Sequence, residues 1–148
     1  MTVLEMIQEG DSIQVRGQIY NVKGKAMYVT EKNPETEYAK ILLNDHNVLV
    51  LSPLDGVAYI GKNMGRIPEF DDFPYSARFN GVQYNQVASD YQMVTQIIFG
   101  STLDVEGEVR YWDYESGDSI ISTAITSRTN DRADVVGQYI SFDEIEIL

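Results

Sequence analysis

The sequence contains no cysteine and only one histidine among its 148 residues. The absence of cysteine excludes disulfides, thiolate nucleophiles and cysteine metal sites. The single histidine excludes a metal site built from several histidines, and a Ser-His-Asp arrangement would have to use it. That residue, His46, lies in Asn44-Asp45-His46-Asn47, which has the composition of a turn. We therefore expect a turn residue at His46, and neither a metal nor a cofactor.

Long apolar runs are also missing. No stretch approaches the roughly 18 apolar residues that a membrane-spanning helix needs, so we expect no direct membrane insertion. Residues 1–10 contain Glu5 and Glu9 and no basic side chain, whereas an export signal begins with positive charge. The expected location is therefore the cytoplasm.

Basic side chains are scarce, with 11 Lys and Arg against 23 Asp and Glu, and a net charge of −12. The deficit is uneven. Residues 1–68 hold eight acidic and seven basic side chains, net −1, and residues 69–148 hold fifteen and four, net −11. Phosphate binding needs clustered Lys and Arg, so nucleic acid is not expected as a partner. An acidic half can attract a cationic partner or can simply keep the protein soluble, and both alternatives stay open.

What the sequence does contain is alternation of polar and apolar residues, which is clearest over residues 103–114. Successive side chains of a strand point to opposite faces, so alternation predicts a strand with one buried and one exposed face. The buried face would contain Leu103, Val105, Gly107, Val109 and Tyr111, and the exposed face Asp104, Glu106, Glu108, Arg110 and Trp112.

Two further local signals are a hairpin and a short helix. Near-continuous apolar runs at 41–43 and 48–51 flank the turn at 44–47, which predicts central strands covered on both faces. Thr2-Val3-Leu4-Glu5 has the spacing of a capping box, and Gly10 can end a helical turn. We therefore predict a short N-terminal helix before the strands begin.

A weak internal repeat indicates how the strands are organised. Gly17-Gln-Ile-Tyr-Asn recurs as Gly81-Val-Gln-Tyr-Asn, and Pro68 and Pro74 between them are typical of a connector. We predict an all-β protein, an antiparallel sandwich or barrel-like unit. It would be a single compact unit, residues 1–148, made of two similar β-meander halves, 1–66 and 76–148, joined by a Pro-rich connector at 67–75.

Short motifs along most of the chain resemble those of an uncharacterised bacterial family, the domain of unknown function 4178. The residues that carry the resemblance are Gly10-Asp11, Tyr20-x-Val22, Glu37-Tyr38 with Leu42 and Leu43, Ser52, Gly107-Glu108, Asp113-Tyr114 and Gly137-Gln138-Tyr139. The resemblance implies a bacterial protein with no known enzymatic activity.

The exposed face of the predicted strand over 103–114 is the main candidate binding site. Its members are Asp104, Glu106, Glu108 and Trp112, with Tyr114 beyond them. Carboxylates beside an aromatic face suit an organic cation, because both the ring and the anion attract it. A polyamine or a peptide rich in Lys and Arg would fit. The alternative is a solvated strand face whose tryptophan is covered by a neighbouring loop.

Three other features favour structural interpretations. Asp71-Asp72 could be an acid and base pair, but adjacent residues in a connector do not have the separated environments that such a pair needs. Residues 113–118 resemble the start of a calcium loop, but the twelfth position is Ala124. The ten tyrosines suit half-buried sheet edges, or else a partner surface. Strands such as 144–148 could pair across a homodimer, although Glu144 and Glu146 discourage such pairing.

These patterns lead to two main functional expectations. The first is a non-enzymatic protein-interaction module of a bacterial cytoplasm, whose acidic C-terminal half faces an unidentified protein partner. The second is a binder of a small organic cation such as a polyamine. An enzyme that uses carboxylates and tyrosines is a third alternative.

Overall fold

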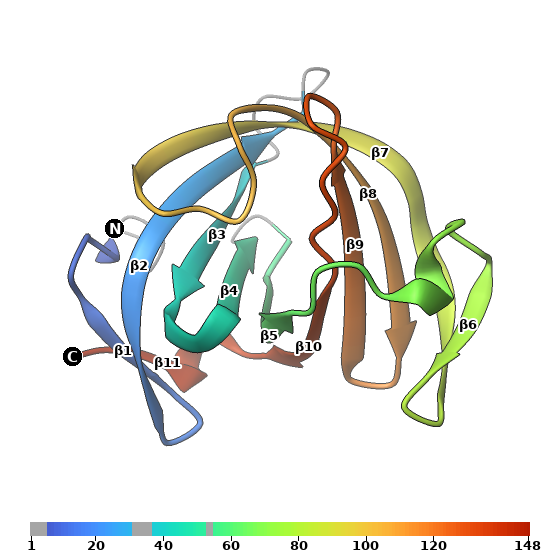
Figure 1. Cartoon of the computed structure of the whole chain (residues 1–148). Helices are drawn as coiled ribbons and strands as arrows, with labels where there is room; N and C mark the ends of the chain where they lie inside the picture. Colours follow the sequence, from blue (N-terminus) through green and yellow to red (C-terminus); the bar gives the residue numbers. More distant parts are fainter. Residues whose placement is uncertain (1–5, 31–36, 53–54) are drawn as a thin grey trace.

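The structure is a computed structural model of the chain that describes residues 6–30, 37–52 and 55–148. The described part is a single antiparallel sheet with three short 3-10 helices (Figure 1). The strands are β1 (Ser12–Val15), β2 (Gln18–Val29), β3 (Glu37–Leu43), β4 (Asn47–Ser52), β5 (Val57–Asn63), β6 (Ser76–Phe79), β7 (Val82–Gly100), β8 (Gly107–Ser116), β9 (Ser119–Thr126), β10 (Val135–Ile140) and β11 (Ile145–Ile147). The helices are η1 (Asn44–His46), η2 (Pro68–Phe70) and η3 (Phe142–Glu144). None of the described helices is long and apolar enough to span a membrane.

The sheet closes into a barrel because β2 pairs on both of its edges. Its strand order is β11-β1-β2-β3-β4-β5-β10-β9-β8-β7-β6, and β2 pairs with β7 as well as with β3. The β2–β7 ladder runs from Gly24 opposite Gly100 to Val29 opposite Val94. Eight of the described strands, β2–β5 and β7–β10, therefore form the barrel wall, and β1, β11 and β6 extend beyond it. The predicted all-β antiparallel class is confirmed, and of the two predicted architectures the barrel is the one observed.

The strand order is the same in β1–β5 and in β6–β10. Each set begins with a short strand that turns into a long one through two residues with positive φ, Arg16-Gly17 in the first and Asn80-Gly81 in the second. Such turns match the twist of the flanking strands. The sets meet where β5 pairs with β10 and where β2 pairs with β7. This order is compatible with the predicted repeat of halves around a connector, which stays a prediction.

Both junctions between the two sets contain a glycine directly opposite another glycine. Gly61 faces Gly137 across β5–β10, and Gly24 faces Gly100 across β2–β7. A Cβ on Gly137 would lie 2.6 Å from the Ile60 carbonyl oxygen, and one on Gly24 would lie only 1.6 Å from that of Ser101. The main chains therefore approach too closely at the junctions for any side chain.

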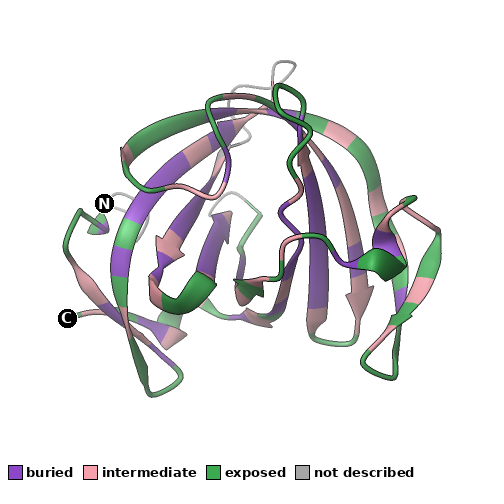
Figure 2. Cartoon of the chain, viewed as in Figure 1, coloured by how far each residue is buried: buried purple, intermediate pink, exposed green. Residues whose placement is uncertain are grey.

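Buried residues occur along the strands of the barrel wall (Figure 2), and their side chains form clusters on both of its faces. Inside are two clusters that contain Val48, Val50, Val109 and Tyr111. Outside β2–β5, an aliphatic cluster fills the space beneath β1 and β11. Outside β7–β9, a mainly aromatic cluster packs under η2 and β6. Residues 48–51 of β4 are all buried because the wall is covered on both faces, as predicted.

Three sequence predictions concern the N-terminal helix, the start of the strand over residues 103–114 and the connector. The N-terminal helix was predicted between Thr2 and Gly10. Residues 1–5 lie outside the described residues, and no helix is found over residues 7–10. The strand predicted from Leu103 begins only at Gly107, whose φ of 118° suits glycine and lets the preceding chain turn away from the sheet. The predicted Pro-rich connector packs against the outside of the barrel, where Phe70 is fully buried.

A tyrosine-lined cavity in the barrel

Six of the ten tyrosines belong to the clusters inside the barrel. They are Tyr28, Tyr38, Tyr59, Tyr91, Tyr111 and Tyr139. Two pairs stack directly across a ladder: Tyr28 on Tyr38 with ring centroids 5.0 Å apart, and Tyr91 on Tyr111 at 5.2 Å. Stacked rings fill the interior while their hydroxyls remain available for hydrogen bonds.

A cavity of about 320 Å³ lies between these tyrosines, near the end of β2 and the β4–β5 turn. This volume is near the lower limit of ordinary small-molecule sites, which is about 300 Å³. Its polar lining consists of Thr30, Tyr38, Ser52, Asp55, Tyr59, Tyr91, Asp113, Ser122 and Tyr139, and its apolar lining includes Val50, Val57, Met93 and Ile120. Among the described residues that line it, no side chain is basic and none is an amide.

Asp113 is the half-buried carboxylate of this cavity. It follows Val109 and Tyr111 on the same face of β8, so strand alternation directs it into the barrel. Its two oxygens accept hydrogen bonds from the Tyr91 hydroxyl at 2.6 Å and the Ser122 hydroxyl at 2.7 Å. Burial raises the pKa of the Asp113 carboxyl, although these two hydrogen bonds oppose the rise. Within the described part of the chain, no basic side chain lies within ion-pair distance of it.

Other hydroxyls in the lining also give their protons to carboxylates. Ser52 donates to Asp55 at 2.9 Å, and the Tyr139 hydroxyl donates to Glu115. Burial raises the pKa of the tyrosine hydroxyls in the lining, so they stay protonated. A hydroxyl whose proton is already donated can only accept further hydrogen bonds. Ser52, Tyr91, Ser122 and Tyr139 therefore present their hydroxyl oxygens as acceptors beside the carboxylates of the cavity.

A buried ion pair lies deeper in the barrel, between Lys40 of β3 and Asp104. Their side chains are 2% and 1% exposed, and Nζ lies 3.6 Å from the carboxylate. Nζ also lies over the rings of Tyr111 and Tyr28, 4.4 and 4.9 Å from their centroids, and the Tyr28 hydroxyl donates to Asp104 at 2.7 Å. Asp104 comes from the inserted loop (residues 101–106), which joins the barrel at the Gly24–Gly100 junction. Burial lowers the pKa of the Lys40 ammonium, and Asp104 opposes this.

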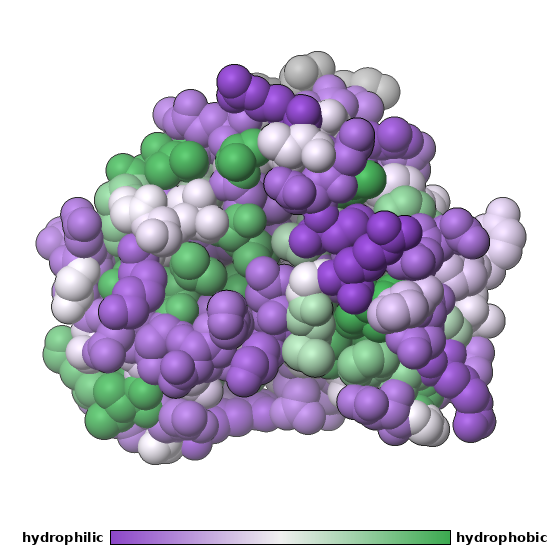
Figure 3. Space-filling model, in the orientation of Figure 1, coloured by the Kyte–Doolittle hydropathy of each residue, from purple (hydrophilic) through white to green (hydrophobic). Residues whose placement is uncertain are grey.

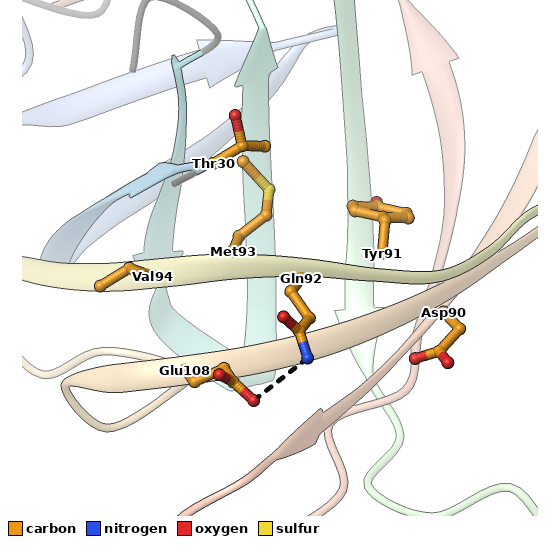
Figure 4. A pocket seen from close by; sticks show the side chains of 7 residues that line it. All are labelled: Thr30, Asp90, Tyr91, Gln92, Met93, Val94 and Glu108. Carbon is orange, nitrogen blue, oxygen red and sulfur yellow. Dashed lines mark hydrogen bonds between the residues drawn. The ribbon is translucent and has the colours of Figure 1, made fainter. Parts of the chain in front are cut away.

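A second cavity of about 370 Å³ lies beside β7, where its pairing with β2 has ended. Thr30, Tyr91 and Met93 line both cavities. In Figure 4 these three side chains lie on one side of β7, and Gln92 and Glu108 lie on the other, joined by a hydrogen bond of 3.4 Å. Tyr91 therefore contacts both cavities, and the second one adds the exposed carboxylate of Glu108.

The predicted binding face does not exist as one surface. Asp104 is buried in the inserted loop, because the strand begins after it. Glu106 and Glu108 are exposed. Trp112 is half-buried and stacks on Phe73 with ring centroids 3.6 Å apart. Tyr114 is fully buried and accepts a hydrogen bond from Gln86, so only the two glutamates remain on the open surface.

The segment that covers Trp112 and Tyr114 is the connector after β5. The Phe70 ring lies 4.6 Å from that of Tyr114. Arg132 holds the segment in place, because its guanidinium bonds the buried Asp134 carboxylate at 2.9 Å and contacts the Phe73 ring. Asp134 also accepts the Ile67 amide at 2.9 Å. The outer face of β8 is therefore a packed interface within the chain.

The remaining sequence candidates lie apart from the cavity. His46 is exposed in η1, at the hairpin turn where it was predicted. Asp71 pairs with Arg66 at 2.6 Å, and Asp72 is exposed. Among residues 6–30, 37–52 and 55–148, no group of acidic and histidine side chains could hold a metal ion.

Sequence reasoning missed Lys40, Asp113 and the interior tyrosines. A signal for Asp113 was present, since the alternation that predicts a buried Tyr111 places Asp113 on the same face. In β3, Tyr38, Lys40 and Leu42 are likewise alternate residues, so they lie on one face of the strand. The polar hydroxyl of a tyrosine favours a sheet edge or a partner surface, and the sequence pattern does not reveal that six of the tyrosines lie inside a closed wall.

Comparison with known families gives one result. The model of a family described as Domain of unknown function (DUF4178) matches residues 8–141. The comparisons with curated proteins and with solved structures gave no match. The matched range includes every residue described above for the cavity and for the Lys40–Asp104 pair.

Proposed function

Because this chain belongs to the DUF4178 family, a domain of unknown function, its activity has to be inferred from the cavity, and we propose that it binds a small organic cation there. This is the second of the two expectations from sequence, now with a different set of residues. Asp113 would be the counter-ion, and Tyr38, Tyr59 and Tyr91 would surround the ligand.

The observation that carries the proposal is the polarity of the lining. Asp113 and Asp55 bring negative charge, and no described lining residue brings positive charge. The hydroxyls of Tyr91, Ser122, Ser52 and Tyr139 already donate to carboxylates. At these hydroxyls and carboxylates, a ligand that accepts hydrogen bonds would face acceptors, whereas one that donates them and is positively charged would be complementary.

The tyrosine rings add a second source of attraction. A cation over an aromatic face gains about 0.5–2 kcal/mol, with the larger value when water is excluded. The barrel itself contains such a contact, since Lys40 lies over two tyrosine rings. Tyr38, Tyr59 and Tyr91 present comparable rings in the cavity. We therefore expect charge and ring contacts to act together on the ligand.

The proposal is for binding and not for catalysis. The Asp113 carboxylate is bonded by two hydroxyls, and His46, the residue that a Ser-His-Asp arrangement would require, is exposed in η1. The Ser122 hydroxyl bonds the Asp113 carboxylate directly, and no histidine of the described residues relays its proton.

Isothermal titration at low ionic strength tests the proposal, with spermidine, tetramethylammonium and n-butylammonium as cations and acetate as the anion. We expect heat from at least one cation and none from acetate. Asp113→Asn should weaken binding at least about tenfold, which is the effect of losing one charged hydrogen bond. Glu106→Gln removes the same charge from the exposed surface and should leave binding unchanged. No heat at millimolar cation, or equal binding by Asp113→Asn, would contradict the proposal.

One observation favours the interaction module as a second candidate function. Ile97, Ile98 and Val105 are 37–46% exposed at the β7–β8 connection, next to the exposed Glu106. Figure 3 shows apolar side chains gathered over this part of the molecule. Exposed apolar groups beside charged ones are typical of contact sites for another protein. Capture of a cytoplasmic protein that Ile98→Asp abolishes and Asp113→Asn does not would support this function.

A further inference from the structure

The barrel already holds one primary ammonium, that of Lys40, and its surroundings show how this fold accommodates such a group. The ammonium is bound by one carboxylate, that of Asp104, and by two tyrosine rings. The carboxylate is oriented by a tyrosine hydroxyl, since Tyr28 donates to it at 2.7 Å.

Asp113 occupies the corresponding position in the ladder of β7 and β8. Lys40 faces Ala26 across β2–β3, and the next inward pair is Tyr28 with Tyr38. Asp113 faces Ala88 across β7–β8, and the next inward pair is Tyr91 with Tyr111. Both tyrosine pairs are stacked. The two positions thus share an alanine partner and a tyrosine pair but carry opposite charges.

The two charges differ in how they are paired. Lys40 has a carboxylate partner, which the inserted loop supplies. Asp113 has a tyrosine hydroxyl that orients it, as Asp104 does, but no ammonium among the described residues. Asp113 and the Tyr91 hydroxyl are therefore arranged in the cavity as Asp104 and the Tyr28 hydroxyl are beside Lys40. No ammonium of the described residues occupies the place beside Asp113.

The lining also distinguishes between kinds of cation. An –NH₃⁺ group can donate to Asp113 and to the Tyr91 oxygen, whose own proton is already committed. A trimethylammonium group has the same charge but no N–H, so it would remove water from these acceptors without replacing the hydrogen bonds. Each buried acceptor left unsatisfied costs about 1–3 kcal/mol. Val50, Val57, Met93 and Ile120 in the wall suit an alkyl chain.

We propose that the ligand is a primary alkylammonium, whose –NH₃⁺ binds Asp113 beside Tyr91 as the ammonium of Lys40 binds Asp104 beside Tyr28. This inference rests on the proposed binding of an organic cation in the cavity. It adds that the hydrogen-bond donors of the cation, and not its charge alone, are recognised.

The test compares ligands with the same four-carbon chain by isothermal titration: n-butylammonium, n-butyltrimethylammonium, n-butylguanidinium and 1-butanol. We expect n-butylammonium to bind at least about tenfold more tightly than n-butyltrimethylammonium, as expected for one unsatisfied acceptor, and also more tightly than 1-butanol, which lacks the charge. Asp113→Asn should reduce this preference to less than about twofold. Tyr91→Phe, which keeps the ring and removes one hydroxyl, should reduce the preference only in part. Circular dichroism of each variant checks that it is folded.

The outcomes separate the two proposals. Equal binding of n-butylammonium and n-butyltrimethylammonium would overturn the primary ammonium and leave the binding of organic cations standing. Tighter binding of n-butylguanidinium would do the same. Failure of every cation to bind the wild-type protein would overturn both. A tenfold preference that persists in Asp113→Asn would show that the ammonium is recognised elsewhere.

Discussion

The strand sets β1–β5 and β6–β10 have the same order around the barrel but treat an interior charge in opposite ways. In the first set, Lys40 is neutralised by Asp104, and rings cover the pair on two sides. In the second, Asp113 is held by two hydroxyls and borders a cavity. The inserted loop thus makes the difference between an interior charge that is closed off, that of Lys40, and one that is available to the cavity, that of Asp113. The inserted loop fills the region around Lys40, and no described segment does so beside Asp113.

The outer faces of the two sets differ as well. The β2–β5 face is covered by β1 and β11 through aliphatic side chains. The β7–β9 face is covered by the connector through aromatic rings and the Arg132–Asp134 pair. The stabilisation from burying aliphatic side chains does not depend on bond direction, whereas a buried ion pair stabilises the fold only when its hydrogen bonds are complete. The second face therefore depends on a few polar contacts.

The largest expected effect comes from opening the Lys40 pair. Asp104→Ala leaves an ammonium buried without its counter-ion, and we expect the free energy of unfolding in urea to fall by about 3–5 kcal/mol. The double variant Lys40→Met with Asp104→Leu removes both charges and should be as stable as the wild type or more so. If Asp104→Ala alone were as stable as the wild type, the ion pair would not be what closes this part of the barrel.

A smaller effect should follow from loosening the connector. Asp134→Ala removes the acceptor of both Arg132 and the Ile67 amide, and we expect a loss of about 2–3 kcal/mol in the same urea measurement. Asp71→Ala breaks the exposed pair with Arg66 on the same segment and should change stability little. Equal losses in the two variants would show that the connector is not held by its buried contact.

The smallest effect at neutral pH is expected from the ionisation of the Asp113 carboxyl, which cation binding requires. Burial raises the pKa of this carboxyl, while Tyr91, Ser122 and Lys40 lower it and Glu115 raises it further. Cation binding needs the ionised form, so affinity for n-butylammonium should fall as the pH drops through this raised pKa, by about tenfold per pH unit below it. The fall should begin at a higher pH than for an ordinary aspartate. Titration calorimetry between pH 7 and pH 4 measures this.

The raised pKa of Asp113 weakens cation binding in acid, but it has the opposite effect on the stability of the fold there. A carboxyl whose pKa is higher in the folded than in the unfolded protein stabilises the fold fully below its unfolded pKa. That contribution is lost as the pH rises through the folded pKa. Asp113→Asn should therefore raise the free energy of unfolding at pH 7 relative to the wild type, and the gain should disappear in acid. A gain that is independent of pH would show that charge is not its cause.

Local patterns predicted much of the wall and little of what it encloses. Val109 and Tyr111 alternate with Glu108 and Arg110 as expected, because each strand face has its own environment. The runs at 41–43 and 48–51 were correctly placed in central strands. The pairing of Gly24 with Gly100 joins segments far apart in the chain, and no short pattern encodes it.

Asp104 shows why the site was harder to predict than the fold. Asp104 alternates with Glu106 and Glu108 in the sequence, which predicted that it would be exposed with them. This was wrong, because regular alternation begins only at Gly107. A residue in a loop takes its environment from the tertiary fold, here from Lys40 and Tyr28. Trp112 and Tyr114 do lie on the predicted outer face of β8, but the connector covers them.

Trp112 and Asp113 are neighbours in sequence on opposite faces of β8, and this gives the protein an intrinsic optical probe. Trp112 is the sole tryptophan, and its ring contacts both the Phe73 ring and the Arg110 guanidinium. Excitation at the red edge of the indole absorption would select it alone. A change in the strand when the cavity fills would then appear as a shift of its emission, recorded without any label.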